Sequence, residues 1–292
     1  MDIMEKINKE GLIFDGAMGS MLISQGLEGA QAPEAWNLTR PEVIREIHEA
    51  YFEAGAHVVT TNTFGGSALK LKKMGVDLSM DDINRAGVKL ARAAAGQGGY
   101  VAGDMGSLGE MLAPMGPVSP KEAQDSFAGQ AQALEDEGVD LFLIETIFDL
   151  NLGLAAVKGV KSVSSRPVFC SLTFKQTPKG FFTIFGNNVA NSMKTLVDEG
   201  VSVVGANCSM GSDAMVELAR EIRSCVEVPV MIQPNAGMPQ TTGDNQVVYP
   251  EDDQFFAGNI KKIKDLGVEI VGGCCGTMPS TIREVKNCLT AG

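Results

Sequence analysis

Short apolar runs alternate along the chain with longer segments in which apolar residues recur at helical spacing. The runs are rich in Val, Ile, Leu, Phe and Thr, and most close on Gly, Asn, Asp or Glu, so each is typical of a buried strand. Eight such runs begin at Leu12, His57, Tyr100, Leu141, Pro167, Val201, Val228 and Val268. Nearly continuous apolar strands of this kind predict a parallel sheet that is covered on both faces.

Amphipathic segments separate these runs, and most of them end on a glycine that can close a helix. The predicted helices cover 41–55, 81–96, 119–138, 191–200, 212–225 and 251–267. Eight strands that alternate with helices predict an α/β fold of the (β/α)₈ TIM barrel type, with an open doubly wound sheet as the alternative.

The pattern also indicates the domain organisation. No Pro/Ser-rich linker or low-complexity tract interrupts it, so residues 1–292 are expected to form a single domain, with 1–10 as a leading helix over the N-terminal end of the barrel. The longest irregular stretches, 105–120 and 236–253, follow the third and seventh strands. They are therefore expected at the C-terminal end of the barrel, where barrel enzymes carry their active sites.

Charge narrows the classes of partner. The chain has 36 acidic and 24 basic residues and a net charge of -12, which disfavours binding to nucleic acid or to anionic membranes. The N-terminus is charged where a secretory signal would be apolar, and no apolar run approaches the roughly 20 residues that span a bilayer. These features predict a cytoplasmic protein, in which the six cysteines stay reduced.

Three of the cysteines follow strands that end at the same face. Cys208 ends the sixth predicted strand, and Cys274 and Cys275 end the eighth. Three thiolates around one open position are typical of a catalytic zinc site. The alternatives for the adjacent pair are packing residues or a vicinal disulfide, but the glycines around them indicate a close approach of the backbone to a ligand.

The other cysteines, Cys170, Cys225 and Cys288, are expected to be small core residues or surface thiols. A zinc ion with three thiolates has a net charge of about -1, so it is a poor Lewis acid. It can, however, hold an entering thiol as a nucleophilic thiolate at neutral pH, and the reaction this chemistry favours is S-alkylation.

Several motifs together carry a resemblance to a known family. They are LIFDGAMGSML, APEAWNLTRPEVIREIHEAYFEAGAHVVTTNTFGG, FLIETI, GANCSMG, QPNAGMP and VGGCCGT. From about Gly11 to Thr277 the chain resembles the homocysteine-binding domain of cobalamin-dependent methionine synthase, within the zinc-dependent homocysteine S-methyltransferase family. The resemblance implies Zn²⁺ on Cys208, Cys274 and Cys275, with the homocysteine sulfur in the fourth position. It also implies that Asn235 fills that position when substrate is absent.

The same resemblance implies an amino-acid site. Asp15 and Glu145 are expected to bind the α-amino group, and the backbone at Gly16 and Ala17 is expected to lie near the carboxylate. Carboxylates at the ends of the first and fourth strands would face one mouth, and an ammonium group needs such partners. The alternative for Glu145 is an acid at a helix N-terminus.

Four further polar residues are expected near the site. Asn62 and Thr63 are candidates for the walls of the substrate pocket. Asp104 and Asp149 are candidates for groups behind the substrate contacts or for helix caps.

The methyl donor is expected to be methylcobalamin or a related corrinoid carried by a separate protein. Multidomain methionine synthases append folate-, cobalamin- and adenosylmethionine-binding domains, and the sequence given ends shortly after Thr277. Met105, Met111 and Met115 are candidates for an adaptable docking surface.

Other functions stay open from sequence. They include another thiol acceptor, a small donor such as S-methylmethionine, and a non-enzymatic zinc barrel that acts as a scaffold for a corrinoid protein. By the same resemblance betaine is disfavoured as donor, because family members that use betaine place aromatic residues beside the zinc, whereas Thr146 and Ile147 follow Glu145 here.

Overall fold

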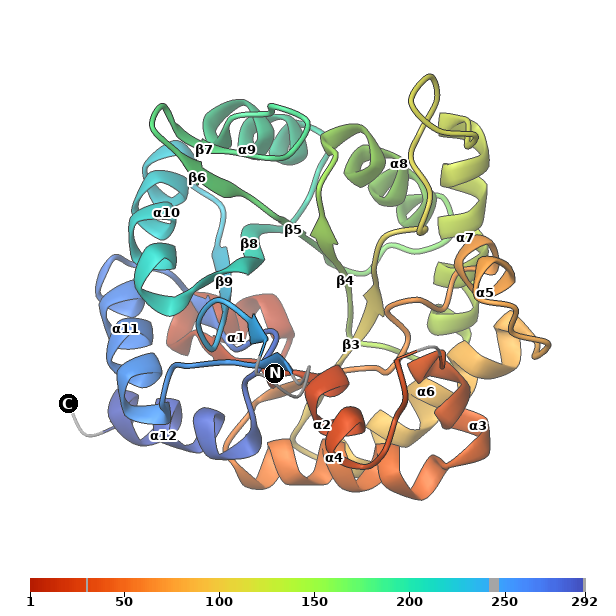
Figure 1. The fold of residues 1–292 in the computed structure, drawn as a ribbon, viewed down its shortest axis with the longest axis horizontal. Helices are drawn as coiled ribbons and strands as arrows, with labels where there is room; N and C mark the ends of the chain where they lie inside the picture. The colour runs from red at the N-terminus through yellow and green to blue at the C-terminus, as the bar shows by residue number, and fades with distance from the viewer. Residues whose placement is uncertain (30, 242–246, 291–292) are drawn as a thin grey trace.

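The computed structural model describes residues 1–29, 31–241 and 247–290. Eight parallel strands form one sheet in the order β1-β12-β9-β8-β5-β4-β3-β2, and helices surround it (Figure 1). The strands are β1 (Leu12–Ile13), β2 (Val58–Thr60), β3 (Tyr100–Met105), β4 (Leu141–Ile147), β5 (Val168–Leu172), β8 (Val203–Gly211), β9 (Val230–Asn235) and β12 (Ile270–Val271). All eight predicted strands are therefore confirmed.

The two ends of this sheet meet. A parallel bridge joins Phe14 to Val58, and the Asp15 amide donates to the Val58 carbonyl at 3.1 Å. One residue earlier on the second strand, the His57 amide donates to the Ile13 carbonyl at 2.7 Å. These bonds pair β1 with β2, so the fold is the expected (β/α)₈ barrel and not an open sheet.

The helices include all six that the sequence pattern predicts, which are α4, α6, α7, α9, α10 and α11. Their bounds, with those of the remaining helices, are α1 (Ile3–Glu10), α2 (Met18–Ser24), η1 (Pro33–Ala35), α3 (Trp36–Thr39), α4 (Pro41–Glu53), α5 (Ala68–Lys73), α6 (Met80–Ala95), α7 (Pro120–Asp136), α8 (Leu150–Lys161), α9 (Val189–Asp198), α10 (Ser212–Cys225), α11 (Asp253–Asp265) and α12 (Pro279–Thr290).

The pattern missed α8 because this helix lacks a broad polar face. Eight of its residues are buried, and a Cβ atom at Gly159 would lie 2.7 Å from the Gln124 carbonyl of α7. The close packing of α7 on α8 therefore requires small residues, and the resulting sequence does not show the usual polar stripe. None of the described helices is both long and apolar enough to cross a bilayer.

Two short hairpins extend from the barrel. β6 (Lys175–Thr177) pairs with β7 (Gly180–Phe182) after β5, and β10 (Gln240–Thr241) pairs with β11 (Val247–Val248) after β9. The stretch 236–253 is thus not irregular throughout, although residues 242–246 within it lie outside the described residues.

The inside of the barrel is filled by apolar side chains from the first residues of the strands. Leu12, Val58, Leu141, Val203 and Ile270 belong to this cluster. Ile3 and Ile7 of α1 pack against the same cluster, with 3% and 1% of their surface exposed. Helix α1 therefore closes the N-terminal end of the barrel, and the polar groups described below lie at the other end of the strands.

Candidate metal and substrate site

The three cysteine sulfurs lie together. Sγ of Cys275 is 4.0 Å from Sγ of Cys208 and 4.0 Å from Sγ of Cys274, and the three sulfurs lie within 4.8 Å of one another. A disulfide would need a separation of about 2.05 Å, so the thiols are free. Three sulfur ligands at the corners of a zinc tetrahedron would lie about 3.8 Å apart, given Zn–S bonds of about 2.3 Å. All three cysteines are partly exposed, so a ligand can reach them.

Strand β8 leaves regular geometry where it presents Cys208. Cys208 and Ser209 have φ values of 62° and 63°, and the pairing with β9 shifts register between Asn207 and Gly211. Residues other than glycine rarely adopt this left-handed region. The strand thus departs from regular pairing at the residue that carries the thiol, and bulges of this kind are common beside active sites.

Glycines shape the turn that carries the other two thiols. A Cβ atom at Gly273 would lie 2.3 Å from Oγ1 of Thr277, and a Cβ atom at Gly276 would lie 2.2 Å from the ring of Tyr249. The Thr277 hydroxyl donates to the Cys274 carbonyl at 2.7 Å and accepts from the Ala17 amide at 3.2 Å. Thr277 thus joins the cysteine turn to the turn after β1.

Hydrogen bonds among the thiols favour one thiolate. Bonds from Cys208 and Cys274, with a smaller contribution from Tyr249, lower the pKa of Cys275 to about 3. The hydrogen bonds of Cys274 with Cys208 and Cys275 raise the pKa of Cys274 well above its usual value. A cluster that already stabilises one negative sulfur near two more is suited to a soft cation. No motif around Tyr249 would have identified it from the sequence.

Asn235 ends β9 beside the cysteine turn. The Cys274 amide donates to the Pro234 carbonyl at 2.7 Å, and the Ala236 amide donates to the Cys275 carbonyl at 2.9 Å. Asn235 is 3% exposed, and within the described part of the chain its Oδ1 atom is buried without a hydrogen-bond partner. A buried amide oxygen without a partner, on a residue whose two neighbours bond to the cysteine turn, is a donor that a zinc site can use. Ligation of a metal by Asn235 stays a prediction.

Three carboxyl groups lie at the same end of the strands. Asp15 is 2% exposed and accepts from the amide and hydroxyl of Thr60 at 2.7 and 3.1 Å. Burial nevertheless raises the pKa of Asp15 to about 8. Burial, with a smaller effect of Cys208, raises the pKa of Glu145 to about 7. Burial and then the charges of Glu145 and Asp15 raise the pKa of Asp104. An ammonium group placed among these carboxyls would offset this cost.

Asn207 is a further residue of this site that the sequence pattern did not indicate. It belongs to the GANC segment and is fully buried. Its Nδ2 donates to Oε2 of Glu145 at 2.8 Å and to Oγ1 of Thr146 at 2.7 Å. Its position directly before Cys208 in a recognised motif was the only signal that could have pointed to it.

The remaining predicted residues lie around this centre. Gly16 is buried, and Ala17 is the N-cap of α2, with its amide already bound to Thr277. The amide nitrogen of Asn62 donates to Pro33 at 2.8 Å, and the fully buried Thr63 donates to the Asp104 carbonyl at 2.7 Å. Both side chains thus hold neighbouring backbone segments together near the C-terminal face of the barrel. A direct contact of either with substrate stays a prediction.

The structure also decides between alternatives for the acids. Asp149 is the N-cap of α8 and accepts from the Asn151 amide at 2.9 Å. Glu145 lies inside β4, four residues before this cap. The alternative in which Glu145 is an acid at a helix N-terminus is therefore wrong.

The other sulfur-containing candidates separate by burial. Cys170 is 1% exposed in the core, whereas Cys225 and Cys288 are partly exposed on α10 and α12. Met105 is fully buried, so its side chain does not contribute to a docking surface. Met111 and Met115 are 50% and 57% exposed.

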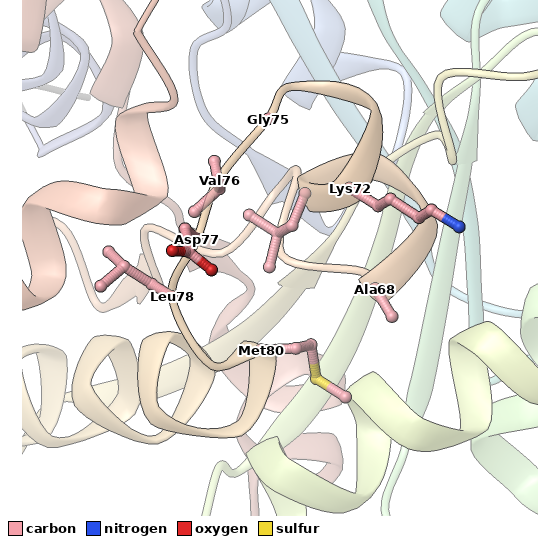
Figure 2. Close-up of a pocket in the computed structure, with 8 residues that line it drawn as sticks. Ala68, Lys72, Gly75, Val76, Asp77, Leu78 and Met80 are labelled. Atoms are coloured by element: carbon pink, nitrogen blue, oxygen red, sulfur yellow. The ribbon is translucent and has the colours of Figure 1, made fainter.

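Two hollows lie away from the thiols. One, of about 400 Å³, is lined by residues of α5, of the connection to α6 and of the start of α6, among them Leu71, Val76 and Met80 (Figure 2). The other, also about 400 Å³, lies at the N-terminal end of the barrel and includes His57 and Lys264. Neither contains a residue of the predicted site.

The fold and the site define a (β/α)₈ barrel whose strand ends bring three thiols and buried carboxyl groups together at its C-terminal face. Residues 12–289 match the family described as homocysteine S-methyltransferase. The chain belongs to this family of methyltransferases.

Relatives and solved structures agree with this assignment. The chain is 33% identical to the methionine synthases of Mycobacterium tuberculosis and Mycobacterium leprae over 304 aligned positions. The match covers 97% of this chain but 25% of each relative, so the chain spans about a quarter of their length. The metallated homocysteine methyltransferase MmuM of Escherichia coli has the same fold, with a TM-score of 0.79, 19% identity, and coverage of 98% of this chain and 99% of MmuM.

Proposed function

We propose that this protein is a zinc-dependent thiol S-methyltransferase that converts homocysteine to methionine with a methyl group from a methylated corrinoid on a separate protein. The observation that carries the proposal is the cluster of Cys208, Cys274 and Cys275, with sulfurs within 4.8 Å of one another, at the same barrel face as Asp15 and Glu145. A thiol site and an ammonium site at one face match the two ends of homocysteine.

The proposed metal site is built from soft sulfur donors, which zinc favours. Cys208, Cys274 and Cys275 would hold Zn²⁺, and Asn235 is the candidate for a fourth ligand in the absence of substrate. When bound, zinc would keep a substrate thiol as its nucleophilic thiolate at neutral pH.

The amino-acid part assigns the carboxyl groups. Asp15 and Glu145 would accept hydrogen bonds from the substrate ammonium. The ammonium would supply the positive charge that these carboxyl groups need in order to ionise in a buried site. Binding of an ammonium would lower both pKa values and leave the carboxyls ionised. The backbone at Gly16 and Ala17, where α2 begins, would lie near the substrate carboxylate. These contacts would fix the sulfur for in-line attack on the methyl group.

The methyl-transfer step itself is a displacement. A corrinoid donor would supply the methyl group and would keep the electron pair of its carbon–cobalt bond as the bond between the substrate sulfur and the methyl carbon forms. The proton of the substrate thiol is released to solvent when the thiolate forms.

The donor proposal is supported by the surface at this end of the barrel. Met111, Met115, Ile184, Met238 and Val247 are each exposed by half or more. They lie in connections that follow β3, β5 and β9, and therefore on the side to which the strands lead. Exposed apolar side chains from several loops are typical of a protein-docking surface. We also propose that the protein works in the cytoplasm, where its thiols stay reduced.

A spectroscopic assay tests the proposal. The zinc-loaded protein is mixed with methylcobalamin and with homocysteine, cysteine or 2-mercaptoethanol, and loss of the methyl–cobalt absorption is followed together with methionine by mass spectrometry. Homocysteine alone is expected to give rapid demethylation and methionine, and Cys275→Ser is expected to give neither. Equal rates with all thiols, or no dependence on Cys275, would refute the proposed function.

A further inference from the structure

We propose that Asn207 is a positioning residue that holds Glu145 at a fixed place relative to the thiol cluster, and that it thereby makes the site selective for thiols that carry an α-amino group. This inference rests on the proposed function and extends it to substrate selectivity.

The Asn207 side chain uses both of its ends. Its Nδ2 donates to Oε2 of Glu145 at 2.8 Å and to Oγ1 of Thr146 at 2.7 Å. Its Oδ1 accepts from the Thr146 amide at 2.9 Å and from Oγ of Ser171 at 2.7 Å. A primary amide has two donors and two acceptor positions, and all four are occupied here. The side chain, which is fully buried, is thus fixed in one orientation.

Asn207 also supports an unusual backbone beside the carboxylate. Thr146 has a φ of 55°, and the pairing of β4 with β5 shifts register between Ile144 and Ile147. The Thr146 amide donates to the Asn207 side chain. A β-branched residue in the left-handed region is costly and persists only where its surroundings hold it. The amide of Asn207 therefore sets the direction in which Glu145 leaves the strand.

The same residue connects this carboxylate to the sulfurs. Asn207 directly precedes Cys208, and its Nδ2 lies 3.8 Å from Sγ of Cys274. The hydroxyl of Thr173 holds the Asn207 carbonyl at 3.2 Å. One buried residue thus fixes the spacing between the ammonium acceptor and the metal-binding thiols. A thiol gains both interactions only if its amino group and its sulfur have the matching separation.

Binding of two thiols to the zinc-loaded protein tests this inference. Homocysteine and 4-mercaptobutanoate differ only in the α-amino group, and calorimetry measures the affinity of each without turnover. The wild-type protein is expected to prefer homocysteine. In Asn207→Ala, homocysteine affinity is expected to fall by about 10- to 100-fold, because a charged hydrogen-bond network is lost. The affinity for 4-mercaptobutanoate is expected to change less than about threefold, and zinc content is expected to stay at the wild-type level.

Two further variants separate positioning from general destabilisation. Asn84→Ala removes another fully buried amide, which donates to the Gly66 and Met80 carbonyls, and it is expected to lower stability without changing the preference between the thiols. Ser171→Ala removes one bond to Asn207 and perturbs the fold less than Asn207→Ala. It is expected to weaken homocysteine binding several-fold, and it keeps the test decisive if Asn207→Ala does not fold.

A double-mutant cycle tests the route of the effect. If Asn207 acts through Glu145, the effect of Asn207→Ala should be small once Glu145 is already changed. The Asn207→Ala/Glu145→Gln double variant is therefore expected to bind homocysteine less than about threefold more weakly than Glu145→Gln alone. Additive losses, or a wild-type preference retained in both Asn207→Ala and Ser171→Ala, would overturn the inference alone. Equal affinity of the wild-type protein for the two thiols would overturn the proposed function, and the inference with it.

Discussion

Sγ of Cys208 lies 4.0 Å from Sγ of Cys275, although 67 positions of sequence separate the two residues. Cys208 leaves β8 through a bulge, and Cys275 lies in the turn after β12, with β9 between these strands in the sheet. The proximity of the sulfurs thus depends on the closed barrel and not on a local metal-binding loop. We expect the barrel to fold without metal and then to bind it, in contrast to a zinc finger.

Replacement of one thiol is therefore expected to remove the metal and to leave the fold. Cys275→Ser should lower zinc from about one equivalent to less than about a tenth, because two thiolates are a much weaker site than three. Elemental analysis gives the zinc content, and circular dichroism reports the fold. Cys225→Ser, on α10, is the matched control and should keep its zinc. Full zinc content in Cys275→Ser would contradict the assignment.

Glu145→Gln keeps the shape of the side chain and removes its charge. Homocysteine binding should weaken by about 10- to 100-fold, which corresponds to the loss of a hydrogen bond to a charged group worth about 1.5–3 kcal/mol. Zinc content should not change, because Gln can still accept from Nδ2 of Asn207. Calorimetric titration measures the affinity, and an unchanged value would show that the ammonium binds elsewhere.

Asp15 predicts a pH dependence of stability in the ligand-free protein. Burial raises the pKa of Asp15 from its ordinary value of 3.8 to about 8, so between these values the folded chain binds more protons than the unfolded chain. The contribution of protonated Asp15 to the free energy of unfolding is fully present below about pH 4 and is lost as the pH rises to about 8. The free energy of unfolding falls by at most about 1.4 kcal/mol per pH unit for this group.

Asp15→Asn removes this titration and keeps an acceptor for the Thr60 amide. Urea unfolding from pH 5.5 to 8.5 should therefore show a smaller decrease in the free energy of unfolding for Asp15→Asn than for the wild-type protein. Parallel curves for the two proteins would refute the raised pKa.

Gly276 and Gly267 form a matched pair for the cysteine turn. Both have a φ of 85°. A Cβ atom at Gly276 would lie 2.2 Å from the Tyr249 ring, whereas a Cβ atom at Gly267 would have no heavy atom of the described residues within 4 Å, its chain neighbours excepted. Each substitution by Ala should cost about 1–2 kcal/mol for the left-handed conformation. Gly276→Ala should in addition displace Tyr249 and weaken zinc binding, which chelator competition measures. Equal zinc affinity in the two variants would contradict a role of this contact.

Local sequence was sufficient for the eight strands, for several of the helices and for the cysteine ligand candidates. Apolar runs that end in polar residues identified all eight strands, because a strand buried on both faces must be apolar throughout. The C-terminal ends of such strands lie at one face of the barrel. The sequence alone therefore predicted that one face of the barrel carries Cys208, Cys274, Cys275, Asp15 and Glu145. Helix α8 was not predicted, since its packing on α7 removes the polar face that the pattern requires.

What only the tertiary structure decided is the role of groups whose partners are distant in sequence. Asn207 binds Glu145 and Ser171 across neighbouring strands, and Tyr249 packs on Gly276 from a different connection. A buried amide or hydroxyl looks like any other polar residue until its partners are placed around it, because its function depends on hydrogen bonds that have no local signature. The sequence by itself thus determined the barrel and the chemistry at its mouth, and the folded chain alone determined which side chains hold that chemistry in place.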